Sequence, residues 1–119
     1  MLAQSKFVSL LDPLRKSGLP GQITLALALL GSAEAQLAQD QPALAVELLR
    51  EAVALREQLL WSQSWELAQA RARLGEAMKR SRLLGGTELL SRGADGLVSQ
   101  LGSNHPQVLR ARRVIAQPA

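Results

Sequence analysis

The residue types that carry most enzyme chemistry are scarce in this sequence. It contains no cysteine and a single histidine, His105. A histidine that acts as a general base needs a nucleophile or a carboxylate within reach. No such motif surrounds the Ser-Asn-His-Pro segment at residues 103–106. We therefore expect His105 to have a structural role in a turn.

Motifs for phosphate, metal and covalent chemistry are also missing. The sequence has no Gly-rich phosphate loop, no nucleophile motif, no paired carboxylates in a polar loop and no metal-ligand spacing. The lack of cysteine excludes disulfides, thiol chemistry and Cys-based zinc sites. We expect a protein that is not an enzyme and that uses no cofactor and no metal.

Basic side chains are the remaining candidates for function, and they are concentrated in the C-terminal part. Residues 1–70 carry five Lys or Arg and seven Asp or Glu, for a net charge of −2. Residues 71–119 carry nine Lys or Arg and three Asp or Glu, for a net charge of +6. A one-sided excess of positive charge favours an acidic partner.

The composition and the turn signals predict that these side chains are carried by helices. The sequence is 47% apolar and only 3% aromatic, and its many Ala and Leu residues are strong helix formers. Pro and Gly separate the apolar segments, and Asp40 stands where it could cap a helix start. We expect no strand, and helices at about residues 22–38, 42–60, 66–81, 84–100 and 105–116.

Two helix types recur at a fixed offset along the chain. A shift of 42 residues lays Leu25, Ala26, Ala28, Glu34 and Ala35 on identical residues at Leu67, Ala68, Ala70, Glu76 and Ala77. A shift of 41 lays Glu47, Leu48, Leu49 and Leu60 on Glu88, Leu89, Leu90 and Leu101. Repetition at this period indicates an array of helical hairpins, in which each hairpin buries its apolar face against its neighbours.

These repeats resemble tetratricopeptide repeats of the longer variety found in kinesin light chains and many bacterial signalling proteins. The matching segments are Leu74-Gly75, Ala38–Ala45, Leu48–Leu55 and Leu101–Pro106, the last being similar to an L-G-x-x-H-P turn. The match covers roughly residues 20–116, with a period of 41 or 42 rather than the familiar 34. It implies an all-α fold, a right-handed superhelical array of antiparallel helix hairpins with about two and a half repeats.

The resemblance divides one domain, residues 1–119, into four parts. These are a partial leading helix at 1–18, repeat 1 at 22–60, repeat 2 at 64–101 and a final helix at 105–116. Leu2, Phe7, Leu10, Leu11 and Leu14 give the leading segment an apolar face. Pro13 would disturb a helix interior, so Asp12-Pro13 could instead begin a second short helix.

The resemblance also implies a protein–protein interaction module. In tetratricopeptide arrays the first helix of each hairpin lines the concave face, which here adds an apolar strip of Leu27, Leu30 and Leu37. The polar residues that this pattern places on the same face are Gln69, Arg73, Glu76, Lys79, Arg80, Arg110 and Arg113. We expect this partly basic groove, with Arg73 and Arg80 on one exposed face, to bind an acidic peptide or a neighbouring domain.

Two alternatives to a peptide-binding module stay open. The Arg-rich C-terminal part could bind nucleic acid, but it has no interleaved aromatic residues and no helix-turn-helix signature, so nucleic acid is unlikely as a partner. The chain could also be the terminal, ligand-free piece of a larger bacterial signalling or regulatory protein.

Small and aromatic residues lead to further expectations about packing. We expect Ala45 and Ala52 to be buried, and the aligned Gly86 and Gly93 to allow close packing. Gly96 aligns with Leu55, so we expect no close contact there and a stabilising Gly96→Ala substitution. Trp61 and Trp65 could anchor a ligand, but the favoured interpretation is that both plug a turn between repeats.

The sequence also indicates where the chain resides and how it assembles. Its most apolar segment, Ile23–Ala33, is 11 residues long, too short to cross a bilayer, so we expect no membrane partner. With no signal peptide evident, we expect a cytoplasmic protein. The end residues Phe7, Leu10, Leu11 and Leu14, and Val108, Val114 and Ile115, predict a homodimer formed through an end of the array.

Overall fold

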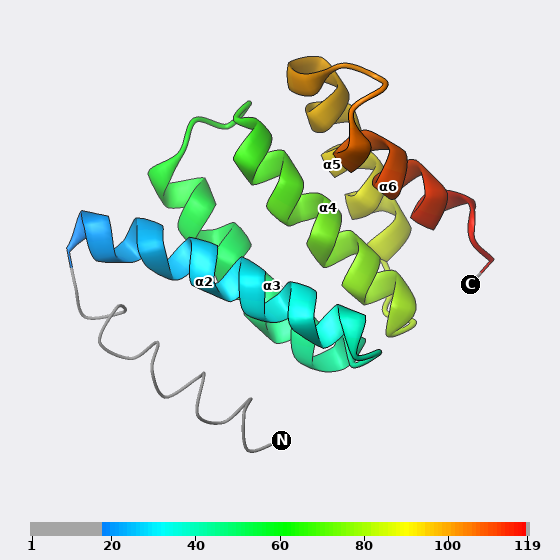
Figure 1. The fold of residues 1–119 in the computed structure, drawn as a ribbon, viewed down its shortest axis with the longest axis horizontal. Helices are drawn as coiled ribbons and strands as arrows, with labels where there is room; N and C mark the ends of the chain where they lie inside the picture. Colours follow the sequence, from blue (N-terminus) through cyan, green and yellow to red (C-terminus); the bar gives the residue numbers. More distant parts are fainter. Residues whose placement is uncertain (1–17, 119) are drawn as a thin grey trace.

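The computed structural model describes residues 18–118, and these fold into five helices with no strand among them (Figure 1). The all-α prediction is therefore confirmed. The predicted leading helix at 1–18 lies almost wholly outside the described residues. The helices are α2 (Leu19–Ala38), α3 (Pro42–Leu59), α4 (Trp65–Arg80), α5 (Gly86–Leu101) and α6 (Pro106–Ala116).

Each helix packs mainly on the helix next to it in the sequence. The short turns reverse the chain, so α2 lies against α3, α3 against α4, α4 against α5, and α5 against α6 (Figure 1). None of these helices combines the length and the apolar character that crossing a membrane requires.

The helix starts follow the sequence signals for two of the turns. Ser64 accepts a hydrogen bond from the Glu66 backbone N–H at 3.2 Å and so caps α4. His105 Nδ1 accepts from the Gln107 N–H at 3.1 Å and caps α6, where Pro106 occupies the first turn. The structural role predicted for His105 is confirmed.

The turn between α2 and α3 corrects the predicted cap. Asp40 has a left-handed backbone with φ 58°, and the residue before α3 is Gln41, which makes no side-chain cap. Asp tolerates this conformation better than most residues. Its carboxylate is turned toward α4, where Oδ1 accepts from Arg80 Nη2 at 2.9 Å. The prediction that Asp40 caps the helix was therefore wrong.

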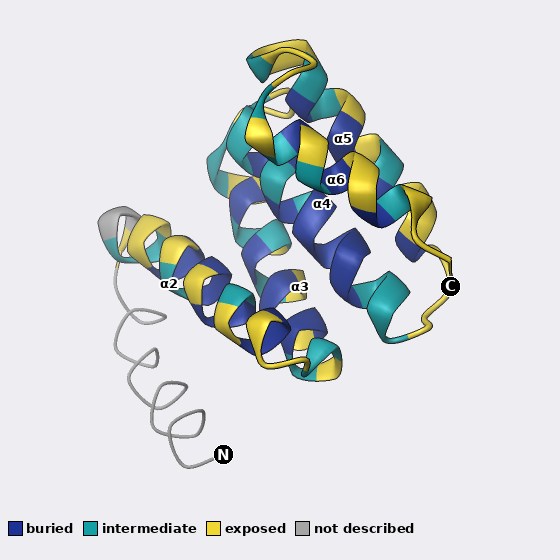
Figure 2. Cartoon of the chain, turned by 45° about the vertical axis from the view of Figure 1, so that its right-hand side comes forward, coloured by how far each residue is buried: buried dark blue, intermediate teal, exposed yellow. Residues whose placement is uncertain are grey.

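Two apolar clusters share α4 between them. The first joins α2, α3 and α4, and includes Leu29 and Leu49 with Leu74 from α4. The second joins α4, α5 and α6, and includes Leu90 and Val108 with Ala72 from α4. Figure 2 shows the result, in which α4 is mostly buried and α2 keeps an exposed side.

Small residues let the paired helices approach closely. Ala45 and Ala52 are fully buried in the first cluster, as predicted. A Cβ added at Gly93 would lie 2.6 Å from the backbone nitrogen of Ala72, and one at Gly86 would lie 2.6 Å from that of Lys79. Since a side-chain carbon cannot fit at such distances, the close packing predicted for these two glycines is confirmed.

Gly96 contradicts the prediction made for it. A Cβ at this position would lie 2.8 Å from the Cβ of Ala68 on α4. Ala68 Cβ is fixed to the backbone, so the helices would have to move apart. We therefore expect Gly96→Ala to lower the free energy of unfolding, not to raise it.

The turn between repeats holds only one of its two tryptophans against the core, and the predicted apolar ends of the array also differ from expectation. Trp65 packs on the second cluster, whereas Trp61 is 66% exposed and plugs nothing in the described chain. Val108 and Val114 are buried against α5 and α4, and Ile115 is packed with them. The prediction that these residues form an uncovered apolar end was wrong, and the other proposed end, residues 7–14, lies outside the described chain.

Glycine substitutions provide a direct test of this packing. A Cβ at Gly31 of α2 meets nothing within 4 Å, so Gly31→Ala should raise the free energy of unfolding by about 0.5–1 kcal/mol through helix propensity alone. Gly96→Ala should lower it, because the contact with Ala68 outweighs the same gain. Urea denaturation measures both, and a stabilised Gly96→Ala variant would contradict the close contact between α4 and α5.

Candidate functional site

One groove of the described chain lies where the C-terminal halves of α2, α4 and α6 meet. Its volume is about 450 Å³, and its lining is mixed, with charged side chains beside small apolar ones. The residues that line it are Glu34, Leu37, Ala38, Glu76, Arg80, Arg110, Arg113, Val114 and Gln117. We call this the α2–α6 groove.

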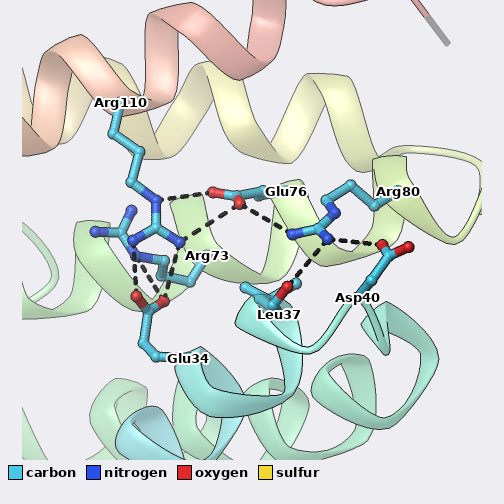
Figure 3. A network of polar contacts seen from close by, with 7 residues as sticks. All are labelled: Glu34, Leu37, Asp40, Arg73, Glu76, Arg80 and Arg110. Atoms are coloured by element: carbon cyan, nitrogen blue, oxygen red, sulfur yellow. Dashed lines mark hydrogen bonds and ion pairs between the residues drawn. The ribbon is translucent and has the colours of Figure 1, made fainter.

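Glu34 is the point at which the three helices are joined (Figure 3). Its Oε1 accepts from Arg73 Nε of α4 at 2.9 Å. Its two oxygens also accept from Arg110 of α6, at 2.7 Å from Nη1 and 3.2 Å from Nη2. The Arg110 contact is bidentate, the geometry that a guanidinium and a carboxylate favour.

Glu76 continues the same network along α4. Its Oε1 accepts from Arg110 Nε at 3.1 Å, and its Oε2 lies 3.7 Å from Arg80 Nη1, one helical turn away. Arg80 then reaches α2, where Nη2 donates to the backbone oxygen of Leu37 at 3.1 Å and to Asp40. Figure 3 shows these contacts as one connected set.

The charges of this ion-pair network cancel. Three guanidinium groups meet three carboxylates, so the network is neutral although it contains most of the predicted basic groove. Each cation already has an acceptor, so its charge is compensated within the chain. The members are Glu34, Asp40, Arg73, Glu76, Arg80 and Arg110.

Burial and pairing act on the arginines in opposite directions. Burial lowers the pKa of Arg73, and the neighbouring Arg110 adds to that effect against the pull of Glu34 and Glu76. Burial alone would also lower the pKa of Arg110, but its hydrogen bonds to Glu34 and Glu76 outweigh burial and raise that pKa. Both side chains stay charged, since an arginine does not lose its proton in proteins. The network is thus ionic, not merely hydrogen-bonded.

The expectation that Arg73 and Arg80 share an exposed face was wrong for Arg73. Its side chain is only 7% exposed, between Glu34 and Gln107 Oε1, which accepts from Nη2 at 3.2 Å. Arg80 does lie on the same side of α4, with 28% of its side chain exposed. Arg73 is therefore part of the protein's own packing.

Gln69, another predicted site residue, also makes an internal contact. Gln69 Oε1 accepts from Arg56 Nη1 at 3.1 Å, which ties α3 to α4. Arg56 is itself buried, and desolvation lowers its pKa despite the opposing charge of Glu66.

Lys79 holds the end of α6. Its Nζ donates to the backbone oxygens of Val114 at 2.6 Å, Ile115 at 3.1 Å and Gln117. A cation at a helix C-terminus is favoured, because the last carbonyls lack partners within the helix. Lys79 is thus fastened to α6 rather than free for a ligand.

Arg113 is the predicted site residue that keeps an uncommitted charge. It is exposed, it lines the α2–α6 groove, and it has no ion-pair or hydrogen-bond partner within residues 18–118. Sequence reasoning missed the acidic members Glu34 and Asp40. The available signal was the 42-residue repeat, which lays Glu34 on Glu76 and so places two carboxylates at equivalent positions.

Other chemistry finds no support in this part of the chain. Among residues 18–118, no group of three or more His, Asp or Glu side chains could hold a metal ion. Comparison with protein-family models, with characterised proteins and with solved structures finds no match to this chain.

The network can be tested with two matched substitutions. Glu76→Gln removes a carboxylate that is 7% exposed and leaves Arg110 and Arg80 partly uncompensated, so it should cost about 2 kcal/mol of stability. Glu57→Gln removes the exposed partner of Arg71 at 3.2 Å and should cost less than about 1 kcal/mol. Equal effects on the denaturation midpoint would contradict a network that stabilises the fold.

Proposed function

We propose that this chain is a protein–protein interaction module, built as a right-handed tetratricopeptide-like array of hairpins that binds a peptide in the α2–α6 groove. The chain reversal at each turn and the 41- or 42-residue repeat support this proposal. The groove has the mixed apolar and charged lining that peptide grooves use.

The observation that carries the proposal is Arg113, which has no partner among residues 18–118 and lies in an otherwise neutral groove. A guanidinium beside Leu37, Ala38 and Val114 suits a ligand with one carboxylate next to a small apolar side chain. Arg80 and Arg110 are 28% and 29% exposed, so they can add a second contact without leaving the network. The ligand we propose is thus mildly acidic, not strongly acidic.

The distribution of charge favours a protein partner over nucleic acid. Nucleic-acid binding needs cations that are free to contact phosphates along a strand. Of the nine Lys and Arg in residues 71–119, six donate to the chain's own carboxylates or carbonyl oxygens. These six are Arg71, Arg73, Lys79, Arg80, Arg110 and Arg112.

The proposal places the module in the cytoplasm, as part of a larger signalling or regulatory protein. The cysteine-free composition agrees with a reducing compartment. Homodimerisation through the N-terminal end stays a prediction, because residues 7–14 lie outside the described chain.

A charge reversal at Arg113 tests the proposed function. Peptides selected from a random display library on the full chain should contain an Asp, a Glu or a C-terminal carboxylate next to a small apolar residue. Arg113→Glu should weaken their binding at least about tenfold, the size expected for a lost hydrogen bond to a charged group.

The matched control for this experiment is the neighbouring residue of the same helix. Arg112 is exposed and does not line the groove, its nearest acceptor being the Ser103 oxygen at 3.5 Å. Arg112→Glu should therefore change affinity less than about twofold, because an exposed charge away from the ligand contributes little. Equal losses in both variants would mean that only the overall charge matters, and no loss in Arg113→Glu would refute the proposed site.

A further inference from the structure

A second depression lies on α2, at the opposite end of the helix from the α2–α6 groove. Ile23, Ala26 and Leu27 of α2 and Leu59 and Leu60 at the end of α3 form its apolar walls, around a volume of about 140 Å³. Apolar cavities of about 150 Å³ accept one benzene-sized group. This depression, the α2–α3 pocket, is therefore large enough for one bulky apolar side chain.

The two polar residues that line the α2–α3 pocket, Arg56 and Glu66, make contacts within the chain, and Glu66 Oε1 accepts from the Ser64 hydroxyl at 2.9 Å. The Arg56 guanidinium donates to the Glu66 backbone oxygen and to Gln69 at 3.1 Å. The pocket therefore offers contact area rather than hydrogen bonds. Its rim is uncovered, because Ile23 is 48% and Leu27 is 60% exposed.

The pocket and the groove lie along the same side of α2. Ile23, Leu27, Glu34 and Ala38 are separated by four, seven and four residues, spacings that keep them on one side of a helix. Figure 2 shows exposed positions along the length of α2. From Leu27 to Ala38 the helix rises by about 16 Å, at 1.5 Å per residue.

We infer that the α2–α3 pocket and the α2–α6 groove are two subsites for one peptide, which carries a bulky apolar side chain about 16 Å from a carboxylate. This inference rests on the proposed function and adds the ligand's second anchor and its spacing. An extended peptide covers that distance in about five residue steps, which leaves about four residues between the two anchors.

Charge decides which occupant fits both subsites. The α2–α6 groove offers the free cation Arg113, so its ligand carries negative charge there. Residues 1–17 hold Lys6, Arg15 and Lys16 against Asp12, a net charge of +2, and the whole chain has a net charge of +4. The chain's own N-terminal segment and a second copy of the chain are therefore poorer matches than a separate, acidic peptide.

A series of defined peptides tests the spacing. Each probe is a fluorescein-labelled peptide with one leucine, a run of zero to nine prolines and a C-terminal aspartate. Proline runs extend by about 3.1 Å per residue, so about five steps span 16 Å, and the peptide with about four prolines should bind the full chain best. We expect its affinity, measured by fluorescence anisotropy, to exceed that of the zero- and nine-proline peptides at least about tenfold.

Two apolar residues provide the matched variants. Leu27→Asp should reduce binding of the four-proline peptide at least about tenfold, to the level of a peptide in which alanine replaces the leucine. Leu84 is 97% exposed in the turn between α4 and α5, and Leu84→Asp should leave the affinity unchanged. Both substitutions alter exposed side chains, so unchanged circular dichroism is expected for both.

The outcomes separate this inference from the proposed function. Binding that depends on Arg113 but on neither the spacing nor Leu27 would overturn the second subsite and leave the proposed function standing. Binding that is indifferent to Arg113→Glu would refute both.

Cysteine cross-linking tests whether the N-terminal segment or a second copy of the chain occupies the pocket instead. Engineered cysteines can pair only with each other, because the natural chain has no cysteine. In a Leu11→Cys, Leu27→Cys variant, we expect no disulfide when the four-proline peptide is bound and none in its absence. A disulfide within one chain would assign the pocket to the N-terminal segment, and one between chains would assign it to a second copy. Either disulfide would overturn the peptide assignment.

Discussion

The ion pairs around Glu34 and Glu76 are the constraint on which the rest of the structure depends. The helix pairs α2 with α3 and α5 with α6 each have their own apolar contacts, and α4 stands between them. Arg110 crosses this division, since it contacts Glu34 of α2 and Glu76 of α4 at once. The ion pairs thus tie α2 directly to α6 across the groove, in addition to the apolar packing that holds each of these helices on the α4 side.

The two sides of α4 explain how a charged network can lie inside a protein of this size. Toward α5 the helix presents Ala72 and Gly75, and the facing Gly93 lets the backbones come close together. Arg73, Glu76 and Arg80, spaced by three and four residues, occupy the other side. Burying such charges is costly unless every one is paired, and here each guanidinium has a carboxylate partner.

The sequence was sufficient to predict features that depend on local patterns. Gly and Pro marked the turns, and the five helices lie within a few residues of their predicted bounds. The repeat alignment of Gly86 and Gly93 with Ala45 and Ala52 also predicted their close packing correctly. The prediction for Gly96 was wrong because the alignment with Leu55 compares equivalent positions on two helices. The contact with Ala68 depends instead on the neighbouring helix, α4.

The candidate site was harder to predict, because the role of each charged side chain depends on partners that are distant in the sequence. The run of basic residues was visible, but Glu34 and Arg110 are 76 residues apart. Excess positive charge in residues 71–119 suggested free cations, although two of the acidic partners, Glu34 and Asp40, come from the other half of the chain. The remaining candidate, Arg113, lies less than one helical turn from Arg110 on α6. The two arginines have different roles only because Arg110 makes ion pairs with α2 and α4 and Arg113 does not.

The most direct test of the account is nitrogen-15 NMR of the arginine side chains in the full chain. A guanidinium held by carboxylates rotates slowly and exchanges its Nε proton slowly. A solvated guanidinium rotates and exchanges fast. The account predicts slow exchange for Arg73 and Arg110 and fast exchange for Arg112 and Arg113. Exchange at Arg73 and Arg110 as fast as at Arg113 would contradict it, because the predicted basic groove would then be open to ligands.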